Sequence, residues 1–272
     1  RSTFRNCFDN GYDKTYSQVV RRYVDNGTGK QNSELISQIY NVLREGYRNE
    51  YYYKNTLLNK LLLGIHSVNT TTALTEIPIA KSKADFVLIN GKAVVYEIKT
   101  ELDNFDRLEN QINDYYKAFD HVAVVTCKEN LQVLKKKIEM IGKPVGIYIL
   151  QKRGTITTIQ KPQAYSVELD AEILFKILRK QEYEEILFNK YKHLPDVSEF
   201  KYYSECKKMF LEIPLEEAYL SVLKLLKKRS QIIKDEFSKI PYELKFLAYF
   251  MNLKSDDYKK ITKFLNESYG GV

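Results

Sequence analysis

The chain has 272 residues, of which 44% are hydrophobic and 29% charged, and its formal net charge is +8 at pH 7. This hydrophobic content is sufficient for one large domain or two smaller ones with a core. The positive charge suits a polyanionic partner such as nucleic acid, although charge alone does not establish one.

The cysteines and histidines argue against a disulfide framework and against a zinc site. There are three of each, widely spaced and without a C-x-x-C motif: Cys7, Cys127, Cys206, His66, His121 and His193. An odd and sparse set of cysteines is typical of a reducing compartment. No apolar run reaches the roughly 18–20 residues that span a bilayer, and the first residues contain no apolar signal-peptide core. We therefore expect a cytoplasmic protein without a membrane partner.

The N-terminal part is polar before it becomes helical. Residues 1–32 contain several Asn-Gly and Gly-Lys breaks around one short candidate helix at residues 16–23, which predicts an arm or cap. A helix is predicted to begin at Asn32, because apolar residues then recur at helical spacing. A second helix is predicted over residues 48–63, with Glu50 in its first turn.

The next part of the chain predicts a β-hairpin. Residues 75–80 form a candidate strand, and Pro78 places it at the edge of a sheet. In residues 84–100, Asn90-Gly91 separates two apolar runs, which is the strongest short-range hairpin pattern.

Three charged residues on this hairpin make it a candidate site. Glu97 and Lys99 are two residues apart on the second strand and so project to one face, and Asp85 lies on the first strand. Burying charges beside such apolar strands is costly unless they are paired or hold a metal.

The register of the hairpin decides whether these charges can meet. A two-residue turn at Asn90-Gly91 would place Asp85 opposite Tyr96, and Asp85 would then lie on the other face from Glu97. We therefore predict a three-residue turn or a β-bulge between Asp85 and Glu97.

Downstream patterns predict an α/β fold followed by helices. Helices are expected over residues 101–119 and 129–141, and strands over 121–126, 145–150 and 155–159. This alternation indicates a mixed sheet flanked by helices. Beyond residue 162 only helical patterns recur, over residues 168–188, 215–237, 242–253 and 256–267. We expect an arm or cap over 1–32, an α/β domain over 33–162 and an all-α C-terminal domain over 163–272.

The site residues resemble a known family signature. Asp85 followed by Glu97-Ile98-Lys99 on the next strand resembles the PD-(D/E)XK nuclease superfamily, with Ala84 in place of Pro. Gln111 and Tyr115 supply the Q-x-x-x-Y motif of the RecB-type branch of that superfamily. The resemblance covers about residues 48–160. It is greatest to a poorly characterised family of bacterial and mobile-element proteins.

The resemblance implies a restriction-endonuclease-like core and a Mg²⁺- or Mn²⁺-dependent nuclease, with DNA favoured over RNA and a homodimer compatible with double-strand cutting. Mg²⁺ prefers hard oxygen ligands. The implied roles are metal ligation by Asp85, Glu97 and the Ile98 carbonyl, water positioning by Lys99, and a second ion or a metal-bound water at Glu50. Gln111 and Tyr115 would brace the site or contact substrate, and Asp103 and Arg107 would lie nearby. Glu34, Glu45 and Glu76 are alternatives to Glu50.

Simpler interpretations exist for the same residues. Asp85 could cap a turn or pair with Lys83, and Glu97 with Lys99 could form an ion pair on an exposed edge strand. Gln111 and Tyr115 are four residues apart on a helix, so ordinary packing would also explain them. The alternative function is a catalytically inactive nuclease-fold module that binds or regulates within a mobile-element or defence system.

Overall fold

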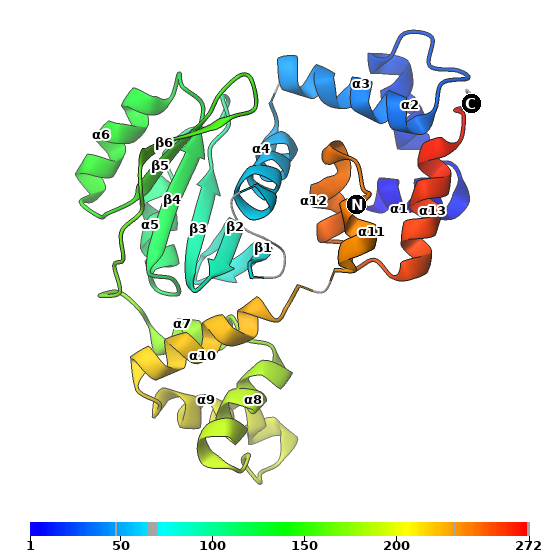
Figure 1. Ribbon diagram of the computed structural model, residues 1–272. Coiled ribbons are helices and arrows are strands. Elements are labelled where there is room, and N and C mark those ends of the chain that lie inside the picture. Colours follow the sequence, from blue (N-terminus) through cyan, green and yellow to red (C-terminus); the bar gives the residue numbers. More distant parts are fainter. Residues whose placement is uncertain (47, 65–69, 231, 271–272) are drawn as a thin grey trace. The chain divides into compact units, whose positions relative to one another are not determined.

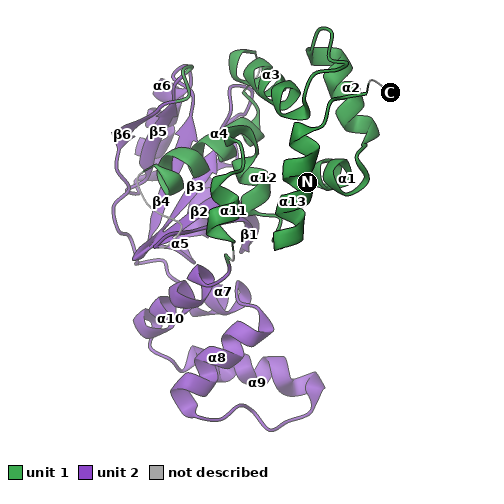
Figure 2. Ribbon diagram, turned by 45° about the vertical axis from the view of Figure 1, so that its right-hand side comes forward, with its two compact units in different colours: residues 1–68, 152–154, 230–272 green, residues 69–151, 155–229 purple. Residues whose placement is uncertain are grey.

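The computed structural model describes residues 1–46, 48–64, 70–230 and 232–270. Two compact units divide the chain (Figures 1 and 2). Unit 1 contains residues 1–68, 152–154 and 230–272, and unit 2 contains residues 69–151 and 155–229. The boundaries of these units differ from those of the three segments 1–32, 33–162 and 163–272 that we expected.

Unit 2 is built on one six-stranded mixed sheet whose strands follow each other in chain order. The strands are β1 (Thr72–Ile79), β2 (Ser82–Asn90), β3 (Lys92–Ile98), β4 (His121–Thr126), β5 (Gly146–Leu150) and β6 (Ile156–Gln160). β1, β2 and β3 pair antiparallel, β3, β4 and β5 pair parallel, and β6 returns antiparallel to β5. Helix α5 (Leu108–Tyr116) connects β3 to β4, and helix α6 (Leu131–Ile141) connects β4 to β5. The expected mixed α/β sheet with flanking helices is confirmed.

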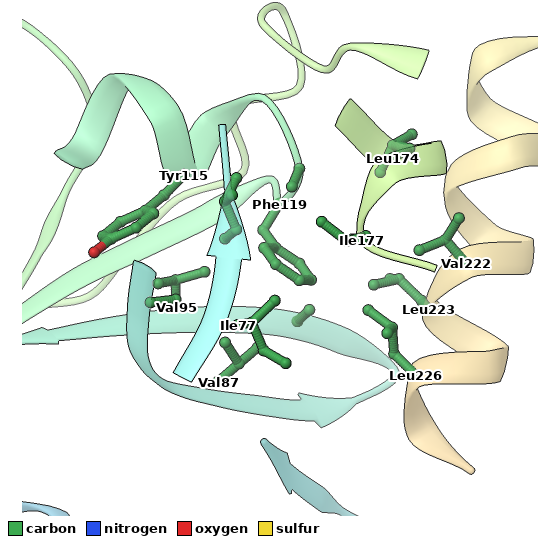
Figure 3. Close-up of a cluster of buried hydrophobic side chains, with 14 of the residues drawn as sticks. Ile77, Val87, Val95, Tyr115, Phe119, Leu174, Ile177, Val222, Leu223 and Leu226 are labelled. Atoms are coloured by element: carbon green, nitrogen blue, oxygen red, sulfur yellow. The ribbon is translucent and has the colours of Figure 1, made fainter. Parts of the chain in front are cut away.

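The C-terminal region after the sheet is helical, as expected, but its first half belongs to the core of unit 2. Four helices follow β6: α7 (Ala171–Lys176), α8 (Lys180–Tyr191), α9 (Glu199–Leu211) and α10 (Leu215–Lys227). One cluster of buried side chains joins Val87 and Val95 of the sheet, Phe119 after α5, Leu174 of α7 and Leu226 of α10 (Figure 3). Burying this continuous apolar surface makes the sheet and α7–α10 one folding unit.

A partly buried ion pair links helix α8 to the end of α10. Arg229 donates from Nε to Glu182 Oε1 and from Nη2 to Glu182 Oε2, both at 2.6 Å, and Nη2 also donates to the Ile177 carbonyl at 2.7 Å. The two side chains are 8% and 13% exposed. Burial raises the pKa of Glu182, but the hydrogen bonds from Arg229 and from the Arg179 amide outweigh it, so this pKa lies below its usual value.

We expect Glu182→Gln to lower the free energy of unfolding by about 1.5 kcal/mol at pH 7, the usual size for a hydrogen bond to a charged group. A depressed carboxyl pKa contributes stability above the unfolded pKa, and that contribution is lost as the pH falls. The difference between wild type and Glu182→Gln should therefore shrink below about pH 4.5. Thermal melts across pH measure it, with Glu139→Gln on the exposed side of α6 as control. A difference that does not depend on pH would contradict this role.

Unit 1 brings both ends of the chain together. Its helices are α1 (Ser2–Asn10), α2 (Lys14–Tyr23), α3 (Asn32–Glu45), α4 (Glu50–Leu57), α11 (Lys234–Ser238), α12 (Lys245–Tyr249) and α13 (Ser255–Asn266), with a π-helical turn over Leu58–Leu63 and a 3₁₀ turn over Tyr242–Leu244. The Asn32 amide and side chain donate to the Glu267 carbonyl at 3.0 and 3.1 Å. The Tyr269 amide donates to the Lys30 carbonyl at 2.8 Å. The polar segment 1–32 is thus fixed by backbone contacts with the chain's last residues, which local sequence patterns do not reveal.

Several helices differ from the expected ranges for local reasons. α5 begins at Leu108 rather than near residue 101, because Asp103 Oδ2 accepts from the Thr100 amide at 2.7 Å and holds a turn there. The helix expected over 168–188 is two helices, α7 and α8, and the helix expected over 215–237 ends at Lys227. Helices α1 and α9 were not predicted.

No helix among the described ranges has both the length and the apolar character needed to cross a bilayer. The three cysteines are buried free thiols.

Candidate functional site

The hairpin turn between β2 and β3 contains an odd number of residues, as predicted. Ile89 pairs with Ala93, and Asn90 pairs with Lys92 around Gly91. Gly91 has φ +74°, a left-handed conformation that glycine adopts without strain. Gly91 alone lies between the paired residues, and the resulting register is the one for which we expected a three-residue turn or a β-bulge.

This register places Asp85 and Glu97 on one face of the sheet. Val87 pairs with Val95, so the residues two positions before Val87 and two positions after Val95 share that face. Both valines belong to the core that α5 covers, and the Tyr115 ring closes one end of this core with its hydroxyl directed away from Phe119 (Figure 3). The site therefore begins where the apolar core ends.

The sheet is irregular at Asp85. In β1, Thr75 pairs with Phe86 and Ile77 with Ala84, but Glu76 between them has φ +59°, which interrupts the ladder opposite Asp85. The Thr75 hydroxyl donates to the Asp85 carbonyl at 2.7 Å. On the other side, the Ile98 amide donates to Asp85 Oδ2 at 2.9 Å. The Asp85 carboxylate thus takes part in the contact between β2 and β3. Left-handed residues other than glycine are strained and cluster at functional sites.

Four of the predicted residues form one hydrogen-bonded network. Glu97 Oε1 accepts from Gln111 Nε2 at 2.5 Å and lies 3.1 Å from Lys99 Nζ. Lys99 Nζ also donates to Gln111 Oε1 at 2.9 Å. Tyr115 donates to Glu97 Oε2 at 2.5 Å, and its oxygen lies 3.0 Å from the Lys83 carbonyl. Gln111 and Tyr115 on α5 therefore fix the Glu-x-Lys pair of β3 from the facing helix.

Burial makes this network energetically significant. Glu97 and Lys99 are 2% and 8% exposed. Glu97 is on β3, which lies inside the sheet between β2 and β4, and Lys99 directly follows the end of β3. The interpretation as an ion pair on an exposed edge strand is therefore wrong. Burial, followed by the negative charge of Glu97 and its hydrogen bond, raises the pKa of Tyr115 well above its usual value, so the hydroxyl stays protonated as a donor. Lys83 pairs with Glu76, which accounts for the lysine that we considered as a partner of Asp85.

The donor set fits a hard divalent cation. Carboxylate oxygens of Glu76 and Asp85 lie within 4.8 Å of each other, and hard oxygen ligands of this kind are the ones that Mg²⁺ prefers. A carboxylate offers about four lone pairs. Glu97 uses three of them on Gln111, Lys99 and Tyr115, which leaves one on Oε2. Asp85 and Glu76 are therefore the residues of unit 2 whose carboxylates come together and could hold Mg²⁺ or Mn²⁺, while metal ligation by Glu97 stays a prediction.

The remaining predicted residues have other surroundings. Asp103 Oδ2 accepts from the Thr100 amide and hydroxyl, and Arg107 precedes the first turn of α5, so both shape the connection between β3 and α5. The Ile98 amide is bound to Asp85, while metal ligation by its carbonyl stays a prediction. Glu50 begins α4 in unit 1, where it pairs with Lys54 at 2.5 Å, and its role at a site of unit 2 also stays a prediction.

Sequence reasoning gave Glu76 too little weight. It was an alternative to Glu50 that precedes the hairpin in the sequence. The strand alternation L-T-E-I-P-I carries no sign of its left-handed backbone. A polar Thr-Glu pair inside an apolar strand was the available signal.

Comparison with known proteins gives one family. Protein cII of Enterobacteria phage P4 is 24% identical over 143 residues, which is 51% of this chain and 49% of that protein. The chain thus spans about half the length of the curated relative it matches. No solved structure matches the chain significantly. The family model for bacteriophage P4 protein cII matches residues 44–246, which include the whole six-stranded sheet and helix α5. This chain therefore belongs to the bacteriophage P4 protein cII family.

Proposed function

We propose that this protein is a Mg²⁺- or Mn²⁺-dependent nuclease that hydrolyses phosphodiester bonds, with DNA as its substrate. The observation that carries the proposal is the meeting of Glu97, Lys99, Gln111 and Tyr115 in one buried network beside Asp85. These are the residues of the PD-(D/E)XK and Q-x-x-x-Y motifs. The sheet arrangement, with the Glu-x-Lys strand between the Asp strand and a parallel strand, supports the same assignment.

Lys99 is positioned for the chemical step. A lysine ammonium has three N–H donors. Two of them are directed to Glu97 Oε1 and Gln111 Oε1, and the third remains for a water molecule or a phosphate oxygen. A fixed positive charge near the scissile group stabilises the charge that develops in the transition state. Because Gln111 and Glu97 hold the ammonium in place, little reorganisation is needed when substrate binds.

The carboxylates would complete the site. Asp85 and Glu97 would hold the cation, with Glu76 beside Asp85. When bound, the cation would offset the negative charge of the phosphoryl group and favour a nucleophilic water near neutral pH. Tyr115 keeps Glu97 oriented throughout, because its hydroxyl stays protonated.

The direct test is cleavage of plasmid and single-stranded DNA by the wild-type protein. We expect cleavage with Mg²⁺ or Mn²⁺ that EDTA abolishes, since hard oxygen ligands require a hard cation. Calorimetric titration with Mn²⁺ measures the site independently of cleavage. We expect heat of Mn²⁺ binding in the wild-type protein and its loss in the Asp85→Asn variant. Carboxylate-dependent Mn²⁺ binding without cleavage of any nucleic acid would contradict the nuclease. The absence of carboxylate-dependent Mn²⁺ binding would favour the inactive binding or regulatory module.

We further propose a cytoplasmic location, supported by the three buried free thiols and by the nucleic-acid substrate. The phage relative is compatible with the resemblance to mobile-element proteins. A homodimer is proposed for double-strand cleavage, and light scattering of the protein with and without duplex DNA tests it.

A further inference from the structure

A polar cleft lies beside the proposed nuclease site within unit 2. It has a volume of about 860 Å³. Its walls come from the turn between β1 and β2, from α5 and from α7, and its lining residues include Lys81, Ser82, Arg107, Asn110, Lys117 and Lys176. Four of these six side chains are cationic.

One carboxylate, that of Asp114, lines the cleft among the described residues, and it is already neutralised. Asp114 is 7% exposed and accepts from Ser82 Oγ at 2.8 Å, from Lys117 Nζ at 2.9 Å and from the Lys81 amide at 3.2 Å. Burial opposes its ionisation, but these hydrogen bonds outweigh burial and hold the pKa of Asp114 below its usual value. Asp114 therefore organises the wall of the cleft and does not repel an anion from it.

The remaining cations are available to a ligand. The side chains of Lys81 and Arg107 are exposed and form no ion pair within the part of the chain that the structure describes. Among the described residues, the ion-pair contact of Lys176 is a long one with Glu172 at 3.8 Å. The exposed amide of Asn110 adds a neutral hydrogen-bonding group between them. Such a set suits an anion with several oxygens, spread over more than one phosphate.

The cleft and the proposed active site share two structural elements. At about 100° per residue, Arg107, Asn110, Asp114 and Lys117 lie along one side of α5, and Gln111 lies next to that side. The turn between β1 and β2 also joins the cleft to the proposed active site. Lys81 and Ser82 line the cleft, and the carbonyl of Lys83 contacts the Tyr115 hydroxyl. A nucleic-acid strand lying in the cleft would reach the Glu97–Lys99 network by passing along one side of α5.

We propose that this cleft binds the sugar-phosphate backbone of the nucleic acid and leads it to the Asp85–Glu97–Lys99 site. The proposal rests on the proposed nuclease function for the identity of the ligand. Lys81 and Arg107 are the principal phosphate contacts, Lys176 extends the contact along α7, and Asn110 bonds to a phosphate or sugar oxygen. The contacts are to the backbone, so binding in the cleft is independent of base sequence.

Fluorescence anisotropy in EDTA, where no cleavage occurs, tests the cleft on its own. The probes are labelled single-stranded DNA, the corresponding duplex and the corresponding RNA. Each lost phosphate contact lowers the salt slope by about 0.7 to 0.9. At about 0.15 M salt this is about four- to fivefold in affinity for each cation, so Lys81→Ala with Arg107→Ala should weaken binding about 15- to 25-fold. The RNA probe shows whether the backbone bound is DNA or RNA.

The matched control removes the same charge elsewhere in unit 2. Lys135 and Lys136 are exposed on α6 and form no ion pair with any described residue. Lys135→Ala with Lys136→Ala should change the affinity less than threefold. Equal losses in the two double variants, or an unchanged affinity in Lys81→Ala with Arg107→Ala, would overturn the cleft proposal. So would a wild-type protein that binds none of the three probes.

These results are separable from the nuclease assay. A wild-type protein that cleaves DNA, but whose binding ignores Lys81 and Arg107, refutes the cleft and leaves the nuclease standing. A protein that binds through the cleft but cleaves nothing with either metal supports the cleft and refutes the nuclease.

Discussion

Replacing Lys99 with alanine is expected to slow metal-dependent DNA cleavage about 10²- to 10³-fold, the usual effect of removing one preorganised stabilising group. Glu97 and Gln111 hold the ammonium of Lys99 in place beside the Glu97 carboxylate. A plasmid-nicking assay with Mg²⁺ or Mn²⁺ measures the loss.

A second variant separates chemistry from folding. Lys99→Ala leaves the Glu97 charge buried without its ion pair, and breaking such a pair can cost about 3–5 kcal/mol of stability. Asp85→Asn keeps an oxygen that can accept the Ile98 amide hydrogen bond and removes only the charge. It should therefore melt near the wild-type temperature and still lose cleavage about 10²-fold or more. Lys136→Ala serves as the control of unchanged activity. Cleavage that survives both Lys99→Ala and Asp85→Asn would refute the assigned site.

Tyr115→Phe is expected to lower the free energy of unfolding by about 2–3 kcal/mol, because it removes a short hydrogen bond to a buried charged group. The Tyr115 ring is fully buried, and its hydroxyl donates to Glu97 Oε2 at 2.5 Å. Denaturation in urea measures the change. The loss of orientation at Glu97 should also reduce the cleavage rate.

The adjacent residue provides a matched control for this prediction. Tyr116 is on the same helix and equally buried, but its hydroxyl has no hydrogen-bond partner among the described residues. Removing an unsatisfied buried hydroxyl is neutral or stabilising. Tyr116→Phe should therefore leave the unfolding free energy unchanged or raise it. Equal destabilisation by Tyr115→Phe and Tyr116→Phe would show that the Tyr115–Glu97 hydrogen bond contributes little.

The local structure around the site followed from short-range patterns. Asn90-Gly91 between apolar runs predicted the hairpin, and the requirement that charges share one face predicted the odd-numbered turn. The spacing of Gln111 and Tyr115 placed them on one side of a helix, where both contact Glu97. These features involve residues that are close in the chain or face each other across one turn. The alternation of side chains along a strand and their spacing around a helix therefore determine them.

By itself, the sequence determined the mixed α/β class, the hairpin and the residues of the central network. Only the tertiary structure decided how the chain divides, because the packing of α7 and α10 on the sheet and the contact of Asn32 with Glu267 join residues far apart in sequence. It also decided the place of Glu76, whose left-handed backbone lies opposite Asp85 across the pairing of β1 with β2. Local sequence patterns encode the type of secondary structure and the direction in which each side chain points. Contacts between distant residues depend instead on which apolar faces the whole chain can bury together.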